Sequence, residues 1–65
     1  MAKATSNMRR IRKGDTFVDV DGRLVTVQGW PQKIDDSRVK VPVLVEGSTR
    51  PSRRIFDGDR RVHLV

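Results

Sequence analysis

The feature that most constrains the fold is the run Val39-Lys40-Val41-Pro42-Val43-Leu44-Val45-Glu46, in which every odd position is valine. Successive side chains of a β-strand point to opposite faces, so this alternation places all four valines on one face. β-branched side chains also favour strands over helices. Pro42 has no N–H to donate to a neighbouring strand, which predicts a sheet edge or a bulge at that position.

A hairpin signature surrounds Asp21-Gly22, which separates the apolar-rich segments 16–20 and 23–28. Asp-Gly is a preferred pair for a two-residue type I′ turn. A two-residue loop predicts that one face of the hairpin, the core face, carries Val18, Val20, Val25 and Val27. Phe17 and Leu24 are then expected on the opposite, partly exposed face.

The rest of the chain also has a β pattern. Residues 53–56 and 60–65 flank Asp57-Gly58-Asp59 and predict a second tight hairpin, while the polar stretch 32–38 predicts an exposed loop. No helix of ordinary length fits after residue 13. About five short strands joined by tight turns predict a small all-β domain with the architecture of an SH3-like barrel. An OB-fold is the second choice, because it usually needs a longer chain and a helix.

The opening of the first hairpin, Lys13-Gly14-Asp15-Thr16-Phe17-Val18-Asp19-Val20-Asp21-Gly22, resembles the K-G-D-x-V-x-V-x-x-G start of KOW-type and other SH3-like modules. The resemblance covers these ten residues. In the KOW pattern a longer, glycine-bearing loop follows the first strand, whereas this chain turns back at Asp21-Gly22. The resemblance implies an SH3-like barrel and points towards nucleic acid.

Length and charge complete the expected organisation. The chain has 65 residues and a net charge of +6, which allows one small core. The excess charge is +5 over residues 1–13 and +3 over residues 50–65, whereas residues 14–49 carry −2. We expect a flexible basic N-terminal arm over 1–13 and a single domain over 14–65. If the chain ends meet, as they often do in small domains, they form one basic pole.

Several function classes are disfavoured by what the sequence lacks. It has no cysteine and one histidine, so we expect no disulfide, no metal centre, no cofactor and no thiol chemistry. Asp35-Asp36 is a pair of carboxylates without a neighbouring base, which is typical of a solvated turn. We therefore expect a protein that is not an enzyme. The chain also shows no apolar run of membrane length and no signal-peptide pattern, which predicts a cytoplasmic protein without membrane contact.

Binding through the basic pole is the leading functional hypothesis. Arginine and lysine side chains neutralise phosphates, and an exposed tryptophan can stack on a base. The expected nucleic-acid-binding residues, for DNA or RNA, are Arg9, Arg10, Arg12, Lys13, Arg50, Arg53, Arg54 and Trp30. The competing interpretation of Trp30 is a core residue.

The alternative hypothesis is a protein-interaction adaptor or inhibitor, of a kind that phages encode, which docks on an acidic surface of a larger complex. Its expected anchors are Phe17, Leu24 and Trp30, because aromatic and large apolar side chains dominate protein interfaces. If these three gather on one exposed face they favour a protein partner, whereas their burial leaves charge alone and favours nucleic acid. A homo-oligomer that pairs strand edges near Pro42 is a third alternative, compatible with either function.

Overall fold

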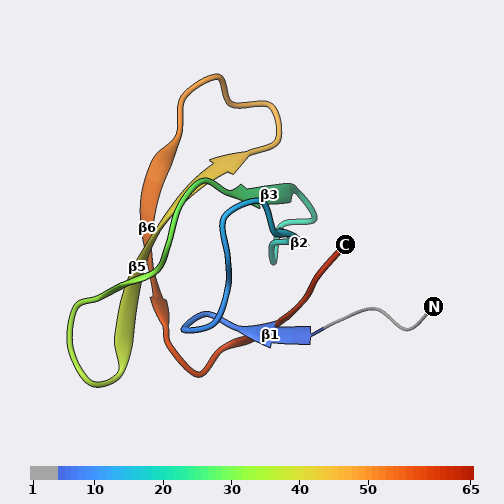
Figure 1. The fold of residues 1–65 in the computed structure, drawn as a ribbon. Coiled ribbons are helices and arrows are strands. Elements are labelled where there is room, and N and C mark those ends of the chain that lie inside the picture. The colour runs from blue at the N-terminus through green and yellow to red at the C-terminus, as the bar shows by residue number, and fades with distance from the viewer. Residues whose placement is uncertain (1–4) are drawn as a thin grey trace.

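A computed structural model describes residues 5–65, and the chain forms a small all-β domain, as predicted (Figure 1). The described residues contain no helix and seven strands: β1 (Thr5–Asn7), β2 (Thr16–Val18), β3 (Leu24–Val27), β4 (Gln32–Lys33), β5 (Arg38–Val45), β6 (Ser52–Asp57) and β7 (Arg61–His63). No helix capable of spanning a membrane occurs between residues 5 and 65.

The strands form two sheets that the C-terminal residues connect. The larger sheet runs β2-β3-β5-β4, with β6 on the other edge of β5, and the smaller sheet pairs β1 with β7. An isolated bridge between Phe17 and Leu64 joins the end of the chain to β2, and the N–H of Val65 donates to the carbonyl of Thr16 at 2.7 Å. Within residues 5–65, β6 pairs with β5 alone, so the sheets do not close into a barrel. The SH3-like resemblance remains a prediction.

The central strand β5 carries the valine alternation as expected. Its four valines, Val39, Val41, Val43 and Val45, are all buried. The expectation that Pro42 marks a sheet edge or a bulge is wrong, because β5 lies between β6 and the strands β3 and β4. The Pro42 carbonyl accepts the N–H of Gln28 at 2.8 Å, beyond the end of β3 and before the start of β4. In an antiparallel strand the N–H and C=O of one residue point to the same side. The N–H that Pro42 lacks would therefore point to the gap between β3 and β4, and its absence removes no hydrogen bond to β6.

The first hairpin forms, but its predicted turn is wrong. The N–H of Asp19 donates to the carbonyl of Arg23, and the N–H of Gly22 donates to the carbonyl of Asp19, both at 2.9 Å. The loop is therefore Val20-Asp21-Gly22, one residue longer than predicted. Among residues 5–65 no residue other than glycine has a positive φ, while Gly22 has φ 85°. A type I′ turn needs two positive values, whereas a type I turn followed by a glycine bulge needs one.

The longer loop shifts the register of the hairpin by one residue and reverses the faces of β2, while Val25 and Val27 of β3 are buried as predicted. Phe17 pairs with Val25, and Val18 pairs with Leu24. Phe17 is consequently buried, with its ring edge-to-face against Phe56, whereas Val18 and Val20 are 50% and 87% exposed. The predicted core positions of Val18 and Val20 are therefore wrong, because a shift of one residue in a β-strand moves every side chain to the other face of the sheet.

The N-terminal segment is part of the domain from Thr5 onward. β1 pairs with β7 in the register Thr5 to His63, and Met8 and Ile11 have 0% and 1% of their surface exposed. The predicted boundary between an arm over 1–13 and a domain over 14–65 therefore does not hold for residues 5–13. Residues 1–4, with Lys3, lie outside the described residues. The β1–β7 pairing places Thr5–Asn7 beside Arg61–His63.

The predicted second hairpin does not form. β6 pairs with β5 over Ser52–Asp57, and β7 pairs with β1. The turn between β6 and β7 is tight, since the N–H of Arg60 donates to the carbonyl of Asp57 at 3.1 Å. After this turn the chain runs towards β1 and does not return along β6.

Candidate nucleic-acid interface

The basic side chains of residues 5–65 divide into paired and free groups. The cations that make an ion pair are Arg9, Arg23, Lys33, Arg38, Arg54 and Arg60. Those that make none with a described residue are Arg10, Arg12, Lys13, Lys40, Arg50, Arg53 and Arg61. A phosphate that binds a side chain of the second group displaces no carboxylate of the described residues.

Arg9, an expected phosphate ligand, holds three loops together instead. Its guanidinium group donates to the carbonyl of Asp36 and lies 3.5 Å from a carboxylate oxygen of Asp59. The side chain packs over Gly58, where an added Cβ would lie 2.4 Å from Nε of Arg9. Gly58 in turn donates its N–H to the carbonyl of Ser37 at 2.8 Å. Arg9 therefore fastens the turn after β1 to the loops before β5 and after β6.

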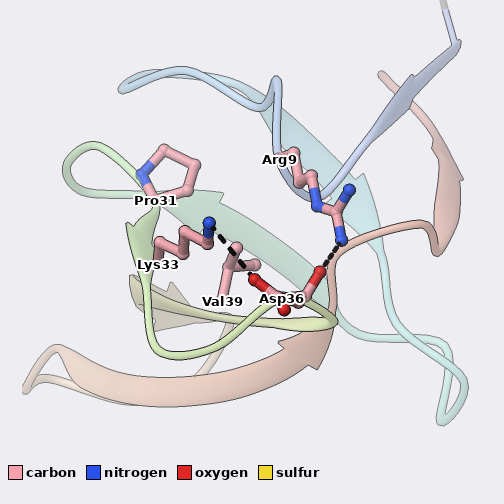
Figure 2. A pocket seen from close by; sticks show the side chains of 5 residues that line it. All are labelled: Arg9, Pro31, Lys33, Asp36 and Val39. Atoms are coloured by element: carbon pink, nitrogen blue, oxygen red, sulfur yellow. Dashed lines mark hydrogen bonds and ion pairs between the residues drawn. The ribbon is translucent and has the colours of Figure 1, made fainter.

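A hollow of about 280 Å³ lies beside Arg9 (Figure 2). Pro31 and Val39 supply its apolar lining, and Lys33 pairs with Asp36 at 3.6 Å on its polar side. The carboxylate of Asp36 opposes the binding of an anion here. Trp30, which precedes Pro31, is 67% exposed, so its interpretation as a core residue is wrong and its surface is free for stacking.

Arg54 is a second expected phosphate ligand that the fold uses internally. Asp19 has a side chain only 7% exposed, and it accepts a hydrogen bond from Nη1 of Arg54 at 2.6 Å. Its other oxygen accepts the N–H of Val20 at 2.8 Å and lies 3.7 Å from Nη2 of Arg60. The Val20 N–H lowers the pKa of Asp19 most, burial opposes this, and the Arg54 hydrogen bond lowers the pKa further. Arg54 and Arg60 thus neutralise a buried carboxylate.

The β1–β7 hollow, lined by Thr5, Ser6, Asn7, Arg10 and Arg61, contains no acidic residue. It has a volume of about 240 Å³. Asn7 and Arg61 are direct cross-strand partners, and Arg10 follows in the turn, where its N–H donates to Oδ1 of Asn7 at 3.0 Å. Both guanidinium groups are free of ion pairs among the described residues. Guanidinium, hydroxyl and amide groups on one hollow can all donate hydrogen bonds to an anion.

No family model, curated protein or solved structure matches this chain. Between residues 5 and 65 no group of three or more His, Cys, Asp or Glu side chains is arranged to hold a metal ion.

The remaining expected ligands do not form one strip. Arg12 and Lys13 lie in the turn before β2, where Gly14 has φ 94° and donates its N–H to the carbonyl of Val27 at 2.8 Å. Arg53 lies on β6, and Arg50 belongs to the connection between β5 and β6, which lies at the opposite end of the molecule from β1 (Figure 1). The basic side chains near the two ends of the chain therefore do not form the single basic pole that the sequence predicts, because Arg50 lies far from β1.

Arg61 is the candidate site residue that sequence reasoning missed. It belongs to the basic run Arg60-Arg61 near the chain end, but only the β1–β7 register shows that it faces the hollow with Arg10. The neighbouring arginine, Arg60, has a different environment, 5.7 Å from the ring centroid of Phe56 and paired with Asp19. Strand alternation explains why two adjacent arginines have different roles.

The expected protein-binding anchors do not gather on one exposed face. Phe17 is buried, Leu24 is half-buried, and Trp30 is exposed on a separate loop. A different apolar surface appears where Val18, Val20, Leu64 and Val65 line a hollow of about 280 Å³. Arg60, Arg61 and His63 border it, together with Asp19, which pairs with Arg60. The shifted hairpin register is what exposes Val18 and Val20 there.

Proposed function

We propose that the protein is a non-enzymatic nucleic-acid-binding module that grips the phosphate backbone at the β1–β7 hollow. The observation that carries this proposal is the placement of Arg10 and Arg61, two unpaired guanidinium groups, on one hollow without a carboxylate. Arginine binds phosphate oxygens in a bidentate manner, which suits a hollow with two such groups.

The side chains of this surface favour binding to the phosphate backbone of nucleic acid over recognition of its bases. Phosphate contacts position a protein on nucleic acid without reading sequence. Arg12 and Lys13, which follow Arg10 closely in the chain, extend the supply of free positive charge. Trp30 is the exposed aromatic side chain that can add stacking on an unpaired base.

The test measures binding to single- and double-stranded DNA and RNA by fluorescence anisotropy over a range of salt concentrations. Arg10→Ala/Arg61→Ala should lower the slope of log K against log salt on duplex DNA by about 2, since each lost phosphate contact removes about 0.9. Lys40→Ala/Arg50→Ala removes two free cations elsewhere and serves as the charge-matched control, with a smaller change in slope.

Two results would overturn the proposal. One is no measurable affinity for any of these nucleic acids at about 50 mM salt, where electrostatic binding is strong. The other is an equal loss of slope in the hollow variant and in its control, which would mean that binding follows net charge and not the hollow.

The hollow beside Val18, Val20 and Val65 favours a second candidate function, docking on a protein. The apolar side chains of this hollow suit a partner that presents an apolar side chain, and Arg61 at its border makes no ion pair with a described residue and suits an acidic neighbour. Val20→Asp should then abolish capture of such a partner while leaving the salt slope for nucleic acid unchanged. Loss of nucleic-acid binding in this variant, with partner capture retained, would reject the docking role.

A further inference from the structure

The outer edge of β6 carries unused hydrogen-bonding capacity. β6 pairs with β5 on one side, and no backbone hydrogen bond from residues 5–65 reaches its other side apart from the turn bond to the Asp57 carbonyl. Such an edge is a template for pairing with another strand.

The pairing of Pro42 establishes which β6 residues face that edge. The Pro42 carbonyl points to Gln28, away from β6, so Pro42 and its cross-strand partner Arg53 are not hydrogen-bonded to each other. Alternation along an antiparallel strand then directs the N–H and C=O of Arg53, Ile55 and Asp57 to the free edge. The side chains of these three residues are exposed, with Ile55 at 55%.

We propose that two copies of the chain dimerise by antiparallel pairing of their β6 edges, with Ile55 opposite Ile55 on the two-fold axis. In this register Arg53 lies opposite Asp57 of the other copy, twice by symmetry. Neither residue makes an ion pair with a described residue of its own chain. The Asp57 carbonyl already accepts the Arg60 N–H, so Asp57 contributes its N–H to the new ladder.

The alternative registers are less favourable. Only a shift by two residues keeps edge-facing groups opposite one another, because an odd shift sets an outward residue against an inward one. A shift in one direction puts Ile55 opposite Arg53, and in the other opposite Asp57, and neither pairs the two charges. Opposite charges that face each other across strands stabilise a pair, whereas unmatched ones do not. The sequence of β6 is thus complementary to itself in one register.

The experiment is sedimentation equilibrium of the whole chain from about 0.01 to 1 mM, because an interface of one strand pair falls below the roughly 1,000 Å² of stable complexes and should be weak. The wild type should show a concentration-dependent dimer. Arg53→Asp should be monomeric through repulsion from Asp57, and Asp57→Arg through repulsion from Arg53. An equimolar mixture of these two variants should associate again, and so should the double variant Arg53→Asp/Asp57→Arg.

Arg50→Asp makes the same change of net charge outside β6 and should dimerise as the wild type does. A wild type that stays monomeric at about 1 mM would overturn the proposal. So would an Arg53→Asp chain that dimerises normally, or a double variant that is folded by NMR and does not associate. The proposal does not depend on nucleic-acid binding, and sedimentation is measured without it.

Discussion

Gly22 determines the loop between β2 and β3, because its φ of 85° is costly for any other residue. An added Cβ would meet no atom within 4 Å, so the cost of substitution is conformational. Gly22→Ala should lower the free energy of unfolding by about 1 kcal/mol. Gly22→Asn should cost less, since asparagine tolerates the left-handed region. Urea denaturation measures both, and equal losses would contradict this account of the loop.

Asp19 links stability to pH. Its pKa in the folded chain lies below the ordinary value of 3.8, chiefly because the Val20 N–H favours the charged form. The stabilisation is therefore complete above about pH 4 and is lost as pH falls through the folded pKa. Asp19→Asn, which loses the charge opposite Arg54, should lower the free energy of unfolding at pH 7 by about 1–2 kcal/mol. Denaturation between pH 7 and 2 should show a smaller acid loss in this variant than in the wild type.

At the scale of elements, the register of β2 buries one residue and exposes the next. Phe17 is buried against Phe56, whereas Val18 is half exposed. Phe17→Ala should cost about 3–5 kcal/mol, enough to unfold a domain of this size. Val18→Asp should leave the fold intact. NMR amide dispersion separates the two outcomes, and an unfolded Val18→Asp chain would favour the register of a two-residue loop.

The elements also show what sequence can predict. The valine alternation of β5 fixes its buried face because burial follows a period of two within the strand itself. Asp21-Gly22 marks a turn but fits two turn types, which differ by one loop residue and so reverse the exposure of Phe17 and Val18. The β1–β7 pairing joins residues near opposite ends of the chain, and no local pattern encodes it. The candidate site depends on that pairing, which is why Arg10 was predicted and Arg61 was not.

At the scale of the whole molecule, Arg9 and Gly58 join loops that are distant in sequence. Gly58→Ala should displace the Arg9 side chain, because the new Cβ would lie 2.4 Å from Nε and 2.9 Å from Cγ. It should therefore destabilise the wild type and have little further effect in an Arg9→Ala chain, as expected for residues that act together. Thermal unfolding of the four chains in this cycle measures the coupling. Additive losses would show that the two residues act independently.

The β1–β7 pairing also has a consequence for synthesis on the ribosome. β1 leaves the exit tunnel early, but its partner strand is translated more than fifty residues later. Until then Met8 and Ile11, which are buried in the folded domain, have no completed core to enter. Such long-range contacts slow folding and prolong the period in which a chain can aggregate. The fold should therefore be completed only after β7 has emerged.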